Sequence, residues 1–145
     1  MYRLLILFCL LSTVLSAQTY VGPSVNTFWT DASDQQSTLG AGYGFRVDYP
    51  SGAWEFNFAG VHSYQWGDDS ELTLTGLLGA TYGNEWLHVG GEAGWSGDNP
   101  AAGLQTYLTT VRGNLRFKAG AHFGQRLRAA SSYYGGTYIT VQFQL

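Results

Sequence analysis

The sequence contains very little cysteine and little charge. Its single cysteine, Cys9, lies in an apolar segment near the N-terminus, and charged residues make up 12% of the 145 residues. A chain with one thiol can form no internal disulfide, and it cannot assemble a Cys-rich metal site. The 7 basic residues are outnumbered by 10 acidic ones, so the basic excess of a nucleic-acid-binding protein is missing. Disulfide-stapled domains and nucleic-acid partners are therefore excluded.

The N-terminus has the pattern of a secretory signal. Arg3 precedes the run LLILFCLLSTVL, which is too short to span a membrane as a helix. We predict a signal peptide at 1–17, cleaved after Ala17 or alternatively after Ser16, and one domain at 18–145. Loss of Arg3 changes the balance to 6 basic against 10 acidic residues, a net charge of -4. The remaining chain has no apolar run of helix-spanning length.

The segment Trp54 to Trp66 is a run in which side chains of two kinds alternate. One face of this alternating run holds Trp54, Phe56, Phe58, Gly60, His62, Tyr64 and Trp66. The other face holds Glu55, Asn57, Ala59, Val61, Ser63 and Gln65. A tryptophan at each end of an apolar face suits a bilayer, because indole rings prefer the two interfaces and a tilted strand of about 9 to 11 residues crosses the hydrocarbon. The pattern predicts a transmembrane β-strand.

Runs with the same period of two recur along the chain, separated by turn residues. They predict strands at Tyr20–Thr30, Thr38–Tyr49, Trp54–Trp66, Glu71–Gly83, Trp86–Ser96, Leu104–Arg112, Leu115–Phe123 and Tyr134–Leu145. The facing of the sixth run is ambiguous, because Leu104 and Leu108 compete with Tyr107 and Val111 for the outward side. Eight is an even number, as single-chain bacterial barrels require. The expected fold class is all-β, an eight-stranded antiparallel transmembrane up-and-down β-barrel.

The connections are predicted to alternate in length. Turns after the second, fourth and sixth strands are short, whereas the others are longer, including Gly97 to Gly103. Short turns face the periplasm in outer-membrane barrels, which would make both termini periplasmic. Under this threading two aromatic belts form at the membrane interfaces, with Trp29, Trp66 and Trp95 at the outer rim and Tyr49, Trp54 and Tyr82 at the periplasmic rim. Trp86 falls at the periplasmic end, and strict alternation turns it inward.

With these features the chain resembles the small eight-stranded outer-membrane β-barrels of the OmpA/OmpX-like group. The last strand, GGTYITVQFQL, is similar to the C-terminal signal read by the barrel assembly machinery, although it ends in Leu145 where an aromatic residue is usual. The resemblance implies a Gram-negative outer membrane, with outer-membrane lipid and the assembly machinery as partners. It implies no single activity.

The inward face is expected to close the barrel. It includes eight ionisable side chains: Arg46, Asp48, Glu55, His88, Glu92, Arg116, Lys118 and His122. An eight-stranded barrel is about wide enough for side chains to fill it, and charges buried there need partners. We interpret them as an ion-pair network that plugs the lumen, with room left by Gly40, Gly42, Gly44, Gly90, Gly94 and Gly120. The alternatives are a narrow path for ions or protons and a His/Glu catalytic site.

The remaining candidates are weaker. His62 and Ser63 together resemble the exposed His and Ser of lipid A deacylases, but neighbouring strand residues face opposite sides and cannot form a nucleophile-base pair. His88, Glu92 and His122 have no recognised metal-ligand spacing. Acidic residues gather in the loops, namely Asp31, Asp34, Asp68, Asp69 and Asp98, where they form either a solvated rim or an attraction for cations or basic partners.

A last candidate lies on the lipid face. Gly60, Gly76 and Gly91 fall near the middle of three consecutive strands, so a shallow groove could dock a membrane-protein partner closely. Outward glycines that only relieve strand curvature are the alternative. We expect a structural or accessory membrane protein without cofactor, metal or catalysis. A narrow channel for ions or small solutes is the second hypothesis, and a secreted lipocalin-like binding barrel is the third.

Overall fold

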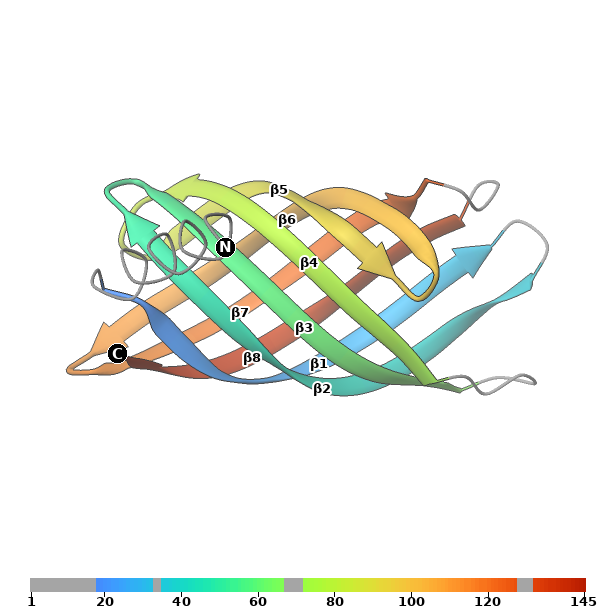
Figure 1. Ribbon diagram of the computed structural model, residues 1–145, viewed down its shortest axis with the longest axis horizontal. Helices are drawn as coiled ribbons and strands as arrows, with labels where there is room; N and C mark the ends of the chain where they lie inside the picture. The colour runs from blue at the N-terminus through green and yellow to red at the C-terminus, as the bar shows by residue number, and fades with distance from the viewer. Residues whose placement is uncertain (1–17, 33–34, 67–71, 128–131) are drawn as a thin grey trace, which may run out of the picture.

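Eight antiparallel strands close into one barrel in the computed structural model (Figure 1). The structure describes residues 18–32, 35–66, 72–127 and 132–145, so the predicted signal peptide lies outside the described residues. The strands are β1 (Tyr20–Ala32), β2 (Gln35–Ser51), β3 (Trp54–Trp66), β4 (Leu72–Gly83), β5 (Leu87–Ser96), β6 (Asn99–Arg112), β7 (Leu115–Arg126) and β8 (Ser132–Gln144). Each pairs with its neighbour in sequence, and β1 pairs with β8. The predicted fold class is confirmed.

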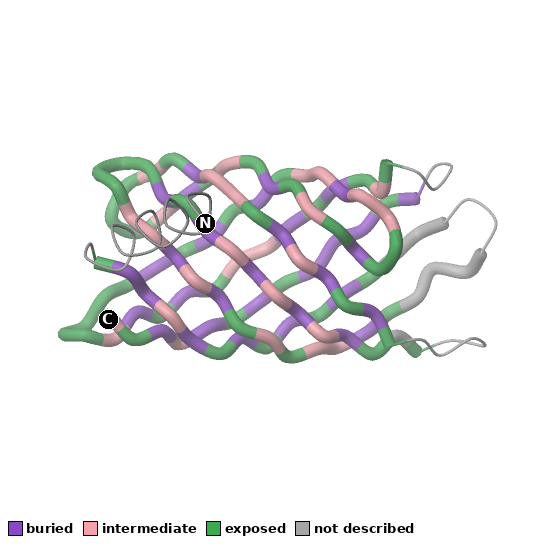
Figure 2. The backbone as a smooth tube through the Cα atoms, viewed as in Figure 1, coloured by how far each residue is buried: buried purple, intermediate pink, exposed green. Residues whose placement is uncertain are grey.

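Buried and more exposed residues alternate along most of the described strand residues, as Figure 2 shows. In β4, for example, Leu72, Leu74 and Leu78 are exposed, whereas Thr73, Thr75 and Leu77 are buried. The apolar face thus points away from the lumen, which is the reverse of a soluble barrel and the arrangement that lipid requires. The described residues include no helix long and apolar enough to cross a membrane.

Proline occurs where a missing backbone N–H does little damage. The β1–β8 register is the same on both sides of Pro23, but the pairs at Gly22 and Pro23 are absent. The Thr140 hydroxyl donates to the Pro23 carbonyl at 2.6 Å. Pro100 lies at the far end of the β6–β7 ladder, where its carbonyl accepts a hydrogen bond from the N–H of Leu127. Pro23 and Pro100 are therefore compatible with closure of the barrel.

The two ends of the barrel differ. Gln18 and Leu145 mark one end, called the termini end here, where the connections are Gly52–Ala53, 84–86 and Gly113–Asn114. Gly52 and Gly113 have φ of 64° and 62°, a conformation that glycine adopts without steric cost. The opposite end, called the loop end, carries the β1–β2, β3–β4, β5–β6 and β7–β8 connections.

The predicted long connection from Gly97 to Gly103 is wrong. Only Gly97 and Asp98 separate β5 from β6, and β6 begins at Asn99 instead of near Leu104. Proline and glycine in this stretch resemble loop residues in sequence, but neighbouring strands supply their backbone partners. This turn lies closer to the middle of the barrel than the loop-end tips of β1 and β2, which extend beyond it in Figure 1.

The structure also shows which way the side chains of β6 and Trp86 face. In β6, Leu104 and Leu108 face outward, whereas Tyr107 is 1% exposed and faces the lumen. Val111 is exposed at the end of the strand. Trp86 precedes β5 and is exposed, so the expectation that it turns inward is wrong, because strand alternation does not apply within a turn.

Candidate functional site

Ion pairs cross the lumen in the half nearer the termini end. Lys118 on β7 places Nζ 2.6 Å from Asp48 Oδ2 on β2 and 2.6 Å from Glu55 Oε1 on β3. Arg116, also on β7, lies 2.5 Å from Glu55 Oε2 through Nη2 and 3.7 Å from Asp48 Oδ2 through Nη1. β3 and β7 are four strands apart in either direction around the ring, so these contacts join opposite walls.

Neutral side chains hold this lumen network, defined as Asp48, Glu55, Arg116 and Lys118, in place. The Tyr107 hydroxyl donates to Glu55 Oε1 at 2.5 Å, and the Tyr107 ring lies 3.7 Å from Lys118 Nζ. Arg116 Nε donates to Thr109 Oγ1 at 2.9 Å. Charge-assisted hydrogen bonds of this kind fix the geometry that a buried pair needs to offset desolvation.

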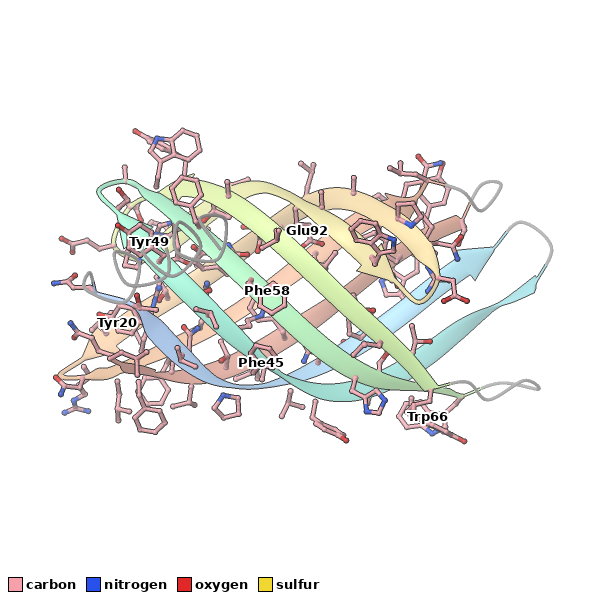
Figure 3. All side chains as sticks on the ribbon, in the orientation of Figure 1. Tyr20, Phe45, Tyr49, Phe58, Trp66 and Glu92 are labelled. Carbon is pink, nitrogen blue, oxygen red and sulfur yellow. The ribbon has the colours of Figure 1, made fainter. Side chains whose placement is uncertain are left out.

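A second cluster lies further toward the loop end. His122 Nδ1 is 3.1 Å from Glu92 Oε1, and the Tyr134 hydroxyl donates to the same oxygen at 3.0 Å. Figure 3 shows Glu92 in the body of the barrel. Glu92 is therefore not joined directly to the lumen network, although the sequence grouped all these residues together.

The last two inward residues have aromatic partners. The Arg46 guanidinium lies 3.5 Å from the centroid of the Tyr138 ring, and His88 stacks on Tyr107 with centroids 4.9 Å apart. His88 and His122 thus belong to different clusters. Within the described part of the chain, no group of three or more His, Cys, Asp or Glu side chains could hold a metal ion.

The buried charges balance. Among the described residues three cations (Arg46, Arg116, Lys118) and three anions (Asp48, Glu55, Glu92) are buried, and all are 6% exposed or less. A lumen with neutral formal charge avoids the self-repulsion that an excess of either sign would cause at low dielectric. The buried cations and anions are therefore equal in number among the described residues.

Inward glycines serve two purposes, of which the sequence indicated only one. A methyl group on Gly120 would meet the Tyr138 ring at 2.6 Å, so this glycine does leave room for a large side chain. At Gly44, Gly90 and Gly94 the same methyl group would meet the neighbouring strand's backbone at 2.1 Å or less. These glycines permit the close backbone approach of a narrow barrel.

The aromatic residues predicted for the two belts lie near the two ends. Trp54 and Tyr82 pair across β3 and β4 at the termini end, with ring centroids 5.3 Å apart in an edge-to-face contact. Figure 3 shows Tyr49 near this end and Trp66 near the other. Trp29 and Trp95 are exposed on the half toward the loop end. All six side chains lie on the outer face, where an interfacial belt would need them.

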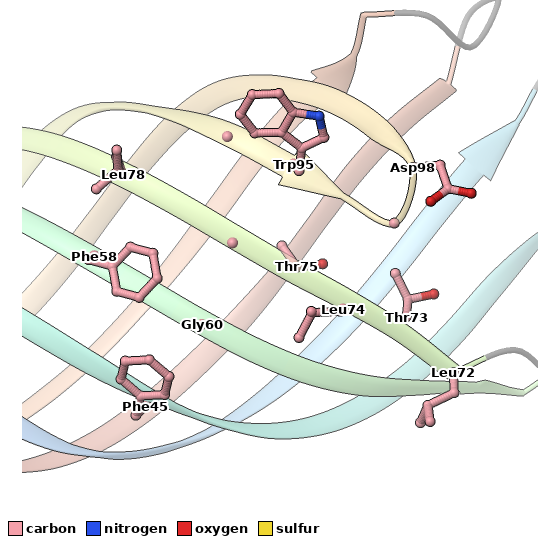
Figure 4. A pocket seen from close by; sticks show the side chains of 13 residues that line it. Phe45, Phe58, Gly60, Leu72, Thr73, Leu74, Thr75, Leu78, Trp95 and Asp98 are labelled. Atoms are coloured by element: carbon pink, nitrogen blue, oxygen red, sulfur yellow. The ribbon is translucent and has the colours of Figure 1, made fainter.

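The lipid-facing wall contains a groove of about 810 Å³ (Figure 4). It lies over β3, β4 and β5, with further lining from β2 and the β5–β6 turn: Phe45, Phe58, Gly60, Leu72, Thr73, Leu74, Thr75, Gly76, Leu78, Gly94, Trp95, Gly97 and Asp98. Gly60 and Gly76 are direct cross-strand partners. A methyl group on Gly76 would meet no atom within 4 Å, whereas one on Gly60 would meet the Phe45 ring at 2.8 Å, so only Gly76 leaves open space on the outer face.

Gly91 does not line this groove, so its predicted inclusion is wrong. The partner of Gly76 on β5 is Trp95, and Gly91 pairs instead with Ala80. Strands in a closed barrel are staggered, so mid-strand positions on consecutive strands do not stay level. This stagger could not be read from strand centres in the sequence.

His62 and Ser63 face opposite sides of β3. His62 Nδ1 lies 3.4 Å from the Tyr43 hydroxyl on the outer face. Ser63 is 1% exposed and donates to the Thr73 carbonyl at 3.3 Å. Their geometry does not form a nucleophile and base.

Tyr107 and Tyr134 are among the lumen residues that the sequence analysis did not include. Each donates to a buried carboxylate, and each is at most 1% exposed. For Tyr107 the available signal was its spacing of two from Thr109, which faces the same side. Tyrosine is common at membrane interfaces, so these two residues did not suggest hydrogen bonds to carboxylates inside the barrel.

Comparison with known proteins identifies the fold. No family model matches the chain, and no curated protein sequence matches it significantly. The crystal structure of Neisserial surface protein A (NspA) matches with a TM-score of 0.69 and 13% identity over 88% of this chain and 97% of that one. Ail, the attachment invasion locus protein of Yersinia pestis, crystallised with the heparin analogue sucrose octasulfate, matches with a TM-score of 0.56 and 10% identity, covering 88% and 98%. The fold is that of the small eight-stranded bacterial outer-membrane barrels.

Proposed function

We propose that this protein is a non-conducting outer-membrane barrel with a structural or accessory role and no catalytic activity. The observation that supports this proposal is the lumen network, in which β7 contacts the opposite wall through Lys118 and Arg116. A vestibule of about 320 Å³ opens at the termini end and reaches Glu55 and Arg116. These two side chains are ion-paired to each other, which supports a vestibule that ends at the network.

Wild-type protein in planar bilayers is expected to pass no steady current. The matched control replaces all four network residues with Ser, which removes two cations and two anions and leaves the formal charge of the lumen unchanged. This variant is expected to conduct, since the space that the long side chains occupy becomes available to water. Wild-type channels with the same conductance as the control would contradict a closed lumen.

We further propose that the termini end faces the periplasm. The connections that span more than three residues, 67–71 and 127–131, both lie at the loop end, which supports that orientation. The expected signal peptide contains the chain's single cysteine, so the mature barrel offers no competing thiol.

The orientation is testable with one introduced thiol at each end. Asp98→Cys at the loop end is expected to react with a membrane-impermeant maleimide on intact cells. Asn114→Cys at the termini end is expected to react only after the outer membrane is permeabilised. Both residues are exposed in turns, so folding should tolerate either change. The reverse labelling pattern would show the opposite orientation.

Assembly and ligand binding complete the proposal. The last strand closes the ring against β1 with Ile139 and Phe143 outward, which supports recognition by the barrel assembly machinery.

Binding of a heparin analogue is a property of Ail. This chain, with 10 acidic and 7 basic residues, lacks the positive excess that a polyanion would need.

A further inference from the structure

Tyr43 projects from the lipid face of β2. Its side chain is 70% exposed, the largest value among the exposed large hydrophobic side chains of the described residues. The Tyr43 hydroxyl lies 3.4 Å from His62 Nδ1 on β3, and the two rings meet edge to face with centroids 5.8 Å apart. A separation of 3.4 Å is at the long limit of a hydrogen bond. Because ionisable side chains are costly in hydrocarbon, such a pair on the lipid face indicates a contact surface.

An opening lies two strands away from Tyr43 on the same face. The free space of the groove lies over Gly76 on β4, where an added methyl group would meet no other atom. Leu74 and Leu78 bound this space along β4, and Trp95 bounds it on the β5 side (Figure 4). We call this space the Gly76 opening.

Tyr43 and the Gly76 opening lie at similar depth in the membrane. Phe45, Gly60, Gly76 and Trp95 are successive cross-strand partners. In Figure 4 this row is inclined, with Gly60 and then Trp95 progressively nearer the loop end than Phe45. At a strand tilt of about 40°, Gly76 lies about 6 Å nearer the loop end than Phe45, and Tyr43, two residues along β2, lies about 5 Å nearer.

We propose that two copies of this chain pair through this face, with Tyr43 of each copy in the Gly76 opening of the other. Copies inserted in one membrane share their orientation, so a two-fold axis along the membrane normal brings residues of equal depth together. β3 lies between β2 and β4, which places His62 near that axis. The inference rests on the membrane setting of the proposed function and does not depend on a closed lumen.

A second copy offers more to this face than a lipid tail does. Lipid tails are as apolar as the wall, so association within the bilayer depends on close packing and on hydrogen bonds. A tyrosine ring over Gly76 gains dispersion contacts with the exposed backbone and an aromatic neighbour in Trp95. The second copy also brings its own Tyr43 and His62, which supply hydrogen-bonding groups that an acyl chain lacks.

Two glycines provide a matched pair of variants. A methyl group on Gly91 would meet only the Gly103 carbonyl oxygen, at 3.7 Å, so this position tolerates a side chain as Gly76 does. Both glycines lie on the lipid face, but only Gly76 lines the groove. Gly76→Leu therefore fills the opening, and Gly91→Leu adds the same side chain elsewhere.

The first test is sedimentation equilibrium of the purified barrel in density-matched micelles. Wild-type protein is expected to show a reversible equilibrium between monomer and dimer. Gly76→Leu and Tyr43→Ala are each expected to raise the dissociation constant at least about tenfold, because the first fills the opening and the second removes the side chain that enters it. Gly91→Leu should dimerise as the wild type does.

The second test uses cysteines in native membranes. The only cysteine of the chain lies in the predicted signal peptide, so an introduced thiol has no competitor in the mature barrel. Chains with Tyr43→Cys and chains with Gly76→Cys, carrying tags of different size, are produced together and oxidised. A mixed disulfide dimer is expected. Gly91→Cys in place of Gly76→Cys should give none, because its thiol lies outside the contact.

Four results would overturn the proposal. They are a wild-type barrel that stays monomeric at every protein concentration, undiminished dimerisation in Gly76→Leu, an equal loss in Gly91→Leu, and equal cross-linking at Gly91→Cys. A monomer that retains a lipid released by Gly76→Leu would assign the opening to that lipid instead. Bilayer conductance and heat-modifiable migration of the same samples report on the lumen and the barrel separately. A folded, insulating monomer would thus refute only the pairing of two copies.

Discussion

Replacing Glu55 with Gln is expected to destabilise the barrel by about 3 to 5 kcal/mol, the range for breaking a buried ion pair by removing one partner. Glu55 accepts contacts from Lys118, Arg116 and Tyr107, and it is fully buried. Its neutral amide would leave two cations facing Asp48 alone. The free energy of unfolding in urea, measured in lipid vesicles, would give the change directly.

Glu92→Gln is the matched control for this variant. Glu92 is also a buried carboxylate, but its contacts are a histidine and a tyrosine hydroxyl, and no lysine or arginine is among them. A neutral amide can still accept their hydrogen bonds, so we expect a smaller loss. The double variant Glu55→Gln with Arg116→Met should recover part of the stability by removing one uncompensated cation. Equal effects in the two Gln variants would refute a structural role for the lumen network.

Leu78→Arg is expected to cost about 2 to 4 kcal/mol, as for a basic residue on the lipid face of a barrel near the bilayer midplane. Leu78 is 66% exposed and lies midway along β4, with apolar side chains around it. The guanidinium would have to stay in hydrocarbon or distort the nearby lipid to reach water. The fraction of heat-modifiable, membrane-inserted protein should fall, and the free energy of unfolding should fall with it.

The control for Leu78→Arg is an arginine substitution on the outer face close to a membrane interface. Val89 is 54% exposed on the same outer face, but it is the cross-strand partner of Tyr82, in the predicted belt at the termini end. Val89→Arg should therefore cost about 0 to 1 kcal/mol, the value near an interface. Equal costs at the two positions would mean that the apolar face is not in contact with lipid.

The comparison of β3 with β6 shows when sequence suffices for a strand. The bounds Trp54–Trp66 are those predicted, because an uninterrupted period of two with a tryptophan at each end specifies both facing and length. In β6 the apolar residues occur on both faces, and Pro100 and Gly103 are residue types that are typical of loops. Pairing with β5 and β7 settles both its start and its facing, and such pairing is non-local.

Except in β6, the sequence by itself determined which strand side chains face inward and which face lipid, because alternation along a strand is a local property of the backbone. Arg46, Asp48, Glu55, His88, Glu92, Arg116, Lys118 and His122 are all buried on the lumen side. Only the tertiary structure decided which of them meet. Closure and stagger bring Lys118 to Asp48 and Glu55 across the lumen, keep Glu92 with His122, and place Trp95 instead of Gly91 beside Gly76. Register is set by the whole ring of hydrogen bonds, and no single strand contains that information.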